Sequence, residues 1–418
     1  MGLAAAYDLL KRGHTVSLYE ADKQLGGMSA SFVFDGIKIE RYYHFICKSD
    51  APLFQMLAEL GIDNKLRWNE TRMGYYYQGK LHDWGEPFAL LKFPGLDIIS
   101  KIRYGLLAFT STKRSDWRKL DNIDAVTWLK RWVGERAYDV LWRPLFELKF
   151  HQFTPNLSAA WIWSRLKRVG TSRKNLLQEE MGYLQGGSDT FLDSIAERIA
   201  TMGGSIKLSE AVQEVQIVDG KVSGIRTHAG SFAFDKVVST IPMPYVAAMV
   251  PALPATTLDK YNSVRNIAVV CVLVHLRDAL TPYFWLNISD RGIDIPGFIE
   301  YSNLNALGGH IVYAPFYIPG DHPDFQQDDA FFIEKVRRYL FSVKPELTEA
   351  GILKIAAGRY RYAQPICEPE FSKRLPPISP GVEGLFIADT SYYYPEDRSI
   401  SESIQLGRLL ATMAGGAC

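Results

Sequence analysis

Apolar and polar positions at the start of the chain first follow a helical pattern and then a strand pattern. Over residues 2–12, small and apolar side chains recur with helical spacing, and Gly13 stands where such a helix would end. Residues 14–20 are rich in apolar and β-branched side chains and close with Glu20. The pattern therefore predicts a helix, a tight turn and a short strand that ends in an acidic residue.

Both kinds of segment return further along the chain. Helical spacing is found over residues 124–133, 157–163 and 401–411, and strand-like apolar runs are found over residues 237–240, 267–275, 310–316 and 385–388. The most apolar run, 267–274, is far shorter than the about 20 residues that a membrane-spanning helix needs. We interpret it as a buried strand.

The order of helix, strand and Glu20 is that of the second half of a dinucleotide-binding βαβ unit. Gly2 then takes the place of the third motif glycine, which allows helix and strand to pack closely, and Glu20 is placed to bind a ribose. We expect the sequence to begin inside this motif, after its first strand and first two glycines. Gly26 and Gly27 follow at a spacing that suits close approach to a pyrophosphate, although a lone glycine pair is more often an ordinary turn.

Four separated segments resemble the FAD-dependent amine oxidase superfamily, which includes protoporphyrinogen oxidases, phytoene-type desaturases and UDP-galactopyranose mutases. The segments are residues 2–30, 182–208, 237–242 and 384–411. In the last of these, a strand ends at Asp389 and a helix follows after a loop. The resemblance implies that FAD is the cofactor and that these segments converge on it.

The family pattern assigns cofactor contacts to individual residues of this sequence. It maps Gly2, Glu20, Gly26 and Gly27 to FAD binding, and it implies that the backbone of Val212 meets the adenine. Met28 stands where the family often has Arg, so the contact at this position differs from the pattern. Toward the flavin ring, the resemblance implies a ribityl contact at Asp389 and a helix N-terminus formed by Ser399, Ile400 and Ser401. Asp389 could equally serve as a capping residue in the turn that follows its strand.

The fold that follows is of the α/β class, with a Rossmann-like FAD-binding domain interleaved with an α+β substrate domain. We predict that the FAD-binding domain comprises residues 1–83, 183–243 and 364–418. The substrate domain would comprise residues 84–182 and 244–363. The active site is expected between the two.

Composition narrows the function further. Lys and Arg total 47 against 46 Asp and Glu, a net charge of +1, so no attraction to nucleic acid is expected. The four cysteines are widely spaced and the eight histidines have no ligand spacing, so no disulfide scaffold and no metal site are predicted. A reducing, cytoplasmic location is therefore expected. The resemblance implies a small-molecule substrate.

Three residues are candidates for a catalytic role. His44 lies in a segment, residues 41–46, that faintly resembles a motif of the sugar mutases, and an imidazole beside a flavin could move a proton near neutral pH. A buried histidine with satisfied hydrogen bonds is the alternative. Tyr393 and Tyr394 precede the last helix and could line a pocket, whereas the adjacent charges at 396–398 suit a structural ion-pair knot.

Residues 88–120 combine basic side chains with large apolar ones. Lysines and arginines outnumber the two aspartates of this stretch, and twelve leucine, isoleucine and phenylalanine side chains are interleaved with them. Such a stretch can lie on an anionic membrane surface. The alternative is a solvated helix packed along one face.

The sequence therefore predicts an FAD-dependent oxidoreductase that removes hydride from a C–N or C–C centre of a large or lipid-like substrate. One rival is a redox-neutral isomerase like the sugar mutases. The other is a truncated binding protein without catalysis. Hydrolase, NTPase and zinc-protease motifs are absent from the sequence.

Overall fold

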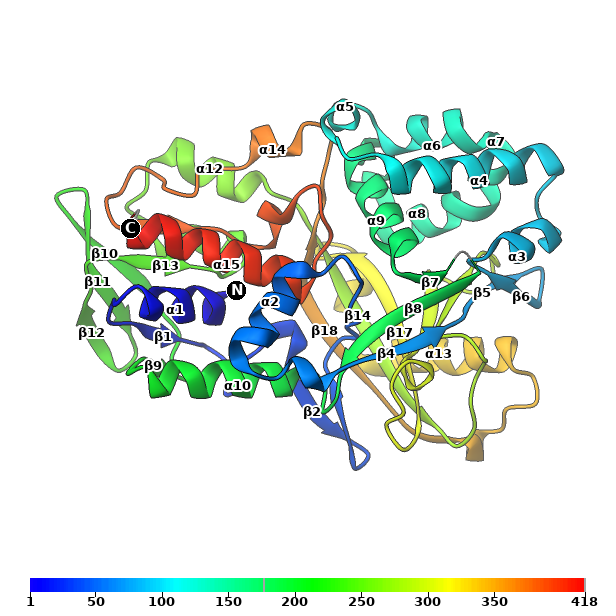
Figure 1. Ribbon diagram of the computed structural model, residues 1–418, viewed down its shortest axis with the longest axis horizontal. Coiled ribbons are helices and arrows are strands. Elements are labelled where there is room, and N and C mark those ends of the chain that lie inside the picture. The colour runs from blue at the N-terminus through cyan, green and yellow to red at the C-terminus, as the bar shows by residue number, and fades with distance from the viewer. Residues whose placement is uncertain (176, 417–418) are drawn as a thin grey trace.

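The computed structural model describes residues 1–175 and 177–416. Its first helix and strand match the sequence prediction, because α1 (Gly2–Lys11) is followed by β1 (Ser17–Tyr19). β1 pairs in parallel with β9 (Ser205–Lys207), and β13 (Val237–Ser239) pairs in parallel with β19 (Leu385–Ile387). Strands from the start, middle and end of the chain thus lie in one region, as Figure 1 shows.

Helices cover these short parallel pairs. α1 packs against the C-terminal helix α15 (Ile400–Gly415) and against α10 (Ser188–Thr201), and α2 (Ala51–Leu60) joins them. A methyl group at Gly407 of α15 would lie 2.6 Å from the carbonyl oxygen of Met1, so this helix contact needs a glycine. At the outer end of this region lies an antiparallel sheet of β10 (Glu214–Val218), β11 (Lys221–Thr227) and β12 (Gly230–Ala233).

The centre of the molecule is a seven-stranded sheet. Its strand order is β18 (Ile352–Pro365), β14 (Asn266–Leu276), β17 (His310–Pro319), β16 (Gly297–Glu300), β15 (Trp285–Ile288), β5 (Met73–Tyr77) and β6 (Lys80–Trp84). All neighbours are antiparallel except β15 and β5. α13 (Asp329–Val343) packs against β14 and β18, so the apolar run predicted as a buried strand is covered on both faces.

The remaining elements form a helical layer and its connections. The helices are α3 (Pro87–Lys92), α4 (Ile98–Lys113), α5 (Arg118–Asp121), α6 (Ala125–Val133), α7 (Glu135–Ala137), α8 (Arg143–Phe150) and α9 (Ala159–Thr171). A sheet of β4 (Leu66–Thr71), β8 (Gln178–Leu184) and β7 (Arg173–Asn175) runs toward this layer, and β2 (Ser31–Phe34) pairs with β3 (Ile37–Glu40). Three short helices complete the fold: α11 (Val246–Met249), α12 (Ala255–Ser263) and α14 (Phe371–Arg374).

The fold is of the predicted α/β class, with segments that interleave along the chain. The domain division itself stays a prediction, and three of its boundaries fall inside strands, including the one between residues 363 and 364 in β18. Residue 83 lies in β6, and β5 and β6 are hydrogen-bonded into the seven-stranded sheet together with strands assigned to the substrate domain. The boundary between residues 182 and 183 lies within β8.

Candidate functional site

A cavity of about 2140 Å³ lies between the parallel strand pairs, the seven-stranded sheet and the helical layer. Its wall draws on the start, the middle and the end of the chain, including α1, β13 and the N-terminus of α15. Small-molecule sites usually measure about 300–1,000 Å³. The cavity is therefore large enough for a dinucleotide and a second molecule beside it.

Glu20 and Asp389 both line this cavity, as the sequence prediction requires. Glu20 follows β1, and its Oε1 accepts a hydrogen bond from the backbone N–H of Asp22 at 2.9 Å. Val212 lines the cavity as well, and the nearby backbone is tied to Glu20, whose carbonyl accepts a hydrogen bond from the N–H of Glu210 at 2.8 Å. The ribose and adenine contacts assigned to Glu20 and Val212 stay predictions, but the two residues share one wall.

The paired glycines adopt backbone conformations that explain their presence. Gly26 has φ 108° and Gly27 has φ 57°, both in the region that favours glycine. A methyl group on Gly26 would lie 2.5 Å from Cδ1 of Leu192, whereas one on Gly27 would meet no atom within 4 Å. Gly27 thus leaves its backbone open to a ligand in the cavity, and Met28 lines the cavity beside it. Gly2 packs against Thr240 and Leu18, which agrees with its predicted part in helix–strand packing.

Asp389 is a buried capping residue. Its Oδ1 accepts a hydrogen bond from the N–H of Ser391 at 2.9 Å, and its Oδ2 accepts one from the N–H of Met243 at 2.8 Å. Burial raises the pKa of the Asp389 carboxyl, while these two backbone donors act in the opposite direction. Asp389 therefore serves as a capping residue, the alternative that the sequence left open. Its contact with the ribityl chain stays a prediction, and that contact would use lone pairs of the carboxylate that these two donors leave free.

The last helix begins where the sequence placed it. Ser399 caps α15 by accepting a hydrogen bond from the N–H of Glu402 at 3.0 Å, and both Ser399 and Ile400 line the cavity. The first N–H groups of a helix have no partner within it, so this end presents donors and a partial positive charge. Ser401 is buried and is not part of the cavity wall.

His44 lines the cavity and is held at both ring nitrogens. Its Nδ1 lies 2.8 Å from Oε2 of Glu40, and its Nε2 lies 3.3 Å from Oγ of Ser29. Glu40 is buried, and its Oε1 accepts a hydrogen bond from the N–H of Ser188 at 2.9 Å. The sequence analysis missed Glu40, although its position four residues before His44 was a possible signal.

The two candidate tyrosines face different surroundings. Tyr393 lines the cavity, and its hydroxyl lies 2.7 Å from Oγ of Ser403. Tyr394 is not part of the cavity wall. Its ring packs against Trp117 and Phe371, and its hydroxyl bonds to Asp121 and to Oγ of Ser158. Side chains of consecutive residues diverge, so Tyr394 ties the loop to the helical layer instead of facing the cavity.

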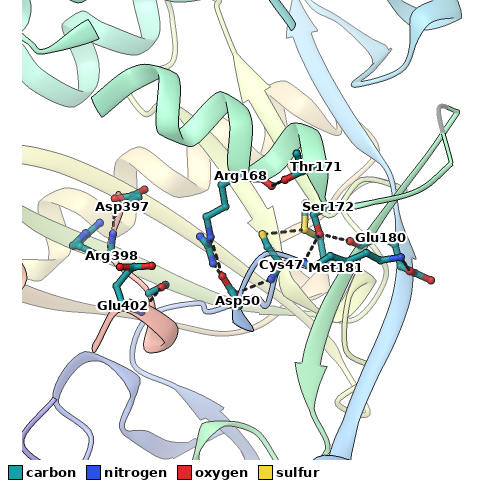
Figure 2. A network of polar contacts seen from close by, with 12 residues as sticks. Cys47, Asp50, Arg168, Thr171, Ser172, Glu180, Met181, Asp397, Arg398 and Glu402 are labelled. Atoms are coloured by element: carbon teal, nitrogen blue, oxygen red, sulfur yellow. Dashed lines mark hydrogen bonds and ion pairs between the residues drawn. The ribbon is translucent and has the colours of Figure 1, made fainter. Parts of the chain in front are cut away.

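A buried polar network, of which the sequence predicted only the charges at 396–398, borders the same cavity (Figure 2). Arg168 of α9 reaches Asp50, with Nη2 3.0 Å from Oδ2, and this oxygen also accepts a hydrogen bond from the N–H of Cys47 at 2.9 Å. In Figure 2, Asp397 and Arg398 lie to the left of Arg168, whereas Cys47 lies to its right. Asp397 accepts hydrogen bonds from Nη2 of Arg165 at 2.8 Å and from the N–H of Arg398 at 2.8 Å.

The charges of this region perturb one another. Although burial acts in the opposite direction, Arg165, Arg398 and Lys149 lower the pKa of Asp397. Burial lowers the pKa of Lys149 well below its ordinary value, and Arg165 adds to this effect. Burial raises the pKa of Glu402 to about 7, with a contribution from Glu396. The charged knot predicted at 396–398 therefore exists, and it extends to α8 and α9.

The residues present suit a bound flavin dinucleotide. The buried Ser239 hydroxyl lines the cavity and has no hydrogen-bond partner among the described residues. The open backbone at Gly27 and the capped N-terminus of α15 lie on the same wall. This wall offers both unpaired polar groups and close access to the backbone.

The family model for flavin containing amine oxidoreductases matches residues 2–351. The chain belongs to this family. This confirms the resemblance, and FAD is accordingly the cofactor of the chain.

Curated relatives of the flavin amine oxidoreductase chain include two desaturases. A zeta-carotene desaturase of Zea mays is 27% identical over 87% of this chain and 73% of its own length. A zeta-carotene desaturase of Synechocystis sp. is 25% identical over 65% of this chain, and the match spans 61% of the Synechocystis protein. Among solved structures, a protein assigned as a protoporphyrinogen oxidase from Exiguobacterium sp. 255-15 superposes with a TM-score of 0.78. It shares 16% identity over 99% of this chain and 96% of its own, which shows a common fold.

Nowhere in residues 1–175 and 177–416 are three or more His, Cys, Asp or Glu side chains grouped so that they could hold a metal ion. Within the same residues, none of the helices has the length and apolar content needed to cross a bilayer.

Proposed function

We propose that this flavin amine oxidoreductase removes a hydride from a C–C centre of a large, mostly apolar substrate and leaves a new double bond. The observation that carries the proposal is the second half of the cavity, away from Glu20 and the paired glycines. There the wall is formed by Trp142, which directly precedes α8, and by apolar and aromatic side chains of α8 and α9, namely Leu145, Phe146, Ile162, Leu166 and Val169. A wall of this kind suits a hydrocarbon chain.

The charges in this half of the cavity favour a C–C centre over an amine. Three carboxylates of the wall already have arginine partners: Asp50 with Arg168, Asp397 with Arg165 and Glu179 with Arg173. Lys149 makes no ion pair with any described carboxylate, and burial lowers its pKa well below the ordinary value. Because the three carboxylates are already paired with arginines, they attract an ammonium substrate only weakly, whereas a neutral hydrocarbon needs no such partner.

The names of the desaturase relatives support the same reaction class, since both proteins are named as desaturases of a carotene. When bound, FAD accepts the hydride that leaves the substrate. The chain's own residues bind and orient: Glu20 and Val212 would hold the adenosine end, and Gly26 and Gly27 would admit the pyrophosphate. His44, positioned by Glu40 and Ser29, is the candidate for taking the proton lost from the neighbouring carbon.

A matched pair of substrates tests the proposal. FAD-loaded protein is mixed without oxygen with a carotene in detergent, or with a long-chain alkylamine in the same detergent, and the absorption of oxidised flavin is followed. We expect the carotene to bleach the flavin and the amine to leave it unchanged. Bleaching by the amine alone, or by neither compound, would overturn the proposal. Turnover of a sugar nucleotide without net flavin reduction would favour the isomerase instead.

A further inference from the structure

Large apolar side chains gather on the outer surface of α3 and α4. Of the 18 large hydrophobic side chains that are exposed in the part of the chain that the structure describes, seven lie within residues 88–109. We call this surface the docking face; it consists of Phe88 and Leu91 on α3 and of Ile98, Ile99, Ile102, Leu106 and Phe109 on α4. Both helices lie at the end of the molecule opposite β10–β12 (Figure 1).

The docking face follows from the helical spacing of α4. Ile98, Ile102, Leu106 and Phe109 recur at intervals of three and four residues and so project from one side of the helix. Leu107 and Ser111, on the other side, are buried against the protein. A solvated face would carry charged side chains in these positions, and contiguous exposed apolar surface marks a binding site.

The docking face adjoins the wall of the cavity. Tyr104, Gly105, Ala108, Phe109 and Thr112 of α4 line the cavity and share a side of the helix next to the apolar one. Phe109 belongs to both surfaces, since it lines the cavity and is 61% exposed. On α3, Leu90 lines the cavity while its neighbour Leu91 is exposed. The cavity thus reaches the surface beside the docking face.

Positive charge surrounds the docking face. Residues 88–114 contain five lysines and arginines and a single acidic residue, Asp97, which caps α4 by accepting a hydrogen bond from the N–H of Ser100 at 2.9 Å. Lys92 and Lys113 are exposed and form no ion pair with a described carboxylate. Each such cation near an anionic bilayer contributes about 1 kcal/mol to binding.

We propose that the docking face binds the surface of an anionic lipid bilayer, with its apolar side chains among the headgroups and Lys92 and Lys113 near lipid phosphates. An apolar substrate would then pass between bilayer and cavity beside Phe109, a step that rests on the proposed function. Apolar side chains ringed by cations on two adjacent helices match this partner better than a second protein chain. The helices lie on the surface of the bilayer and need not cross it.

Sedimentation with vesicles tests the docking. FAD-loaded protein is mixed with vesicles of phosphatidylcholine alone or with phosphatidylserine added. We expect binding to the anionic vesicles and weaker binding to the neutral ones. Ile99→Glu/Ile102→Glu should weaken the partition by more than about tenfold, because it places two charges on the apolar face. Lys92→Gln/Lys113→Gln should weaken binding to the anionic vesicles by about thirtyfold and leave binding to the neutral ones unchanged.

The matched control is Val33→Glu/Val218→Glu, which adds the same charge at two valines of β2 and β10 with comparable exposure, 70% and 59% against 66% and 56% for Ile99 and Ile102. It should bind vesicles like the wild type. Wild-type protein that stays in solution with every vesicle, or an Ile99→Glu/Ile102→Glu variant that binds normally, would overturn the proposal. The proposal would also be overturned if the wild type formed a dimer without binding vesicles and only Ile99→Glu/Ile102→Glu, not the control, abolished that dimer.

The flavin content and the turnover of a detergent-dispersed carotene are measured on the same samples. If Ile99→Glu/Ile102→Glu loses vesicle binding but keeps its flavin content and its turnover of the carotene, both the docking and the proposed function are supported. If the wild-type protein binds anionic vesicles but does not oxidise the carotene, the docking proposal stands and the proposed substrate class is rejected.

Discussion

The ammonium nitrogen of Lys149 lies 4.7 Å from the centre of the Tyr317 ring, at the wall of the cavity. A ring face stabilises a cation only partly, by about 0.5–2 kcal/mol. No described carboxylate forms an ion pair with Lys149, and Arg165 adds repulsion. The folded chain therefore favours the neutral amine at this position more than the unfolded chain does.

Lys149→Met should raise the free energy of unfolding by about 1 kcal/mol at neutral pH, because the buried ammonium is removed. The pKa of Lys149 is lowered in the folded state, so the unfolded state binds the extra proton. The stability of the wild type should therefore rise with pH toward the ordinary lysine pKa of about 10.4, relative to the variant. Urea denaturation at several pH values measures this difference. A variant that is less stable at neutral pH, or a difference that does not change with pH, would contradict it.

Asp50→Ala should lower the free energy of unfolding by about 3–5 kcal/mol, because it leaves the Arg168 guanidinium buried without a counter-charge. The N–H of Cys47 would lose its acceptor at the same time. The double variant Asp50→Ala/Arg168→Met should recover most of the loss, since no unpaired charge remains. Urea denaturation of the three proteins checks this. A double variant as unstable as Asp50→Ala would show that the ion pair is not the cause.

Gly26→Ala and Gly27→Ala should separate folding from cofactor binding. Both positions have positive φ, which costs an alanine about 1–2 kcal/mol. Gly26→Ala also clashes with Leu192, so it should lose about 1–3 kcal/mol more. Gly27→Ala meets no protein atom, and its methyl group should mainly weaken FAD binding. Denaturation and FAD titration of the apoprotein measure the two effects. Unchanged FAD affinity in Gly27→Ala would contradict the assigned contact.

Glu20→Gln should weaken FAD binding by about tenfold, the effect of removing a charged hydrogen-bond acceptor from a ribose, with little loss of stability. Asp389→Asn should lower both FAD affinity and stability, because Asp389 also holds the N–H groups of Met243 and Ser391. Glu214→Gln, on β10 and outside the cavity wall, is the control and should change neither. Fluorescence titration with FAD checks the order. Glu20→Gln with wild-type affinity would remove Glu20 from the cofactor site.

Local sequence patterns predicted the elements that carry their own signals. The helical spacing before Gly13, the β-branched run up to Glu20 and the strand before Asp389 all appear as helix or strand where expected. Gly26 and Gly27 were identified because positive φ restricts the choice of residue. These features depend on a few consecutive residues, so the sequence displays them directly.

The sequence analysis failed where contacts join distant segments. Tyr394 was grouped with Tyr393 because they are neighbours, but their side chains diverge into different surroundings. The pairing of β5 with β15 brings residues 73–77 into a sheet formed mainly by residues beyond 266, which no local pattern could indicate.

By itself, the sequence determined that this chain has a helix and a strand in the order typical of a dinucleotide-binding unit, paired glycines and an acidic residue at the end of each of two strands. Only the tertiary structure decided that Glu20 and Asp389 share one cavity and that this cavity reaches the apolar face of α4. It also decided that Asp50 pairs with Arg168 of α9 and that Lys149 is placed where Arg165 of the same helix repels its charge. The reason is physical. Backbone conformation and hydrophobic period are set by neighbouring residues, whereas burial and the pairing of charges depend on which distant segments pack together.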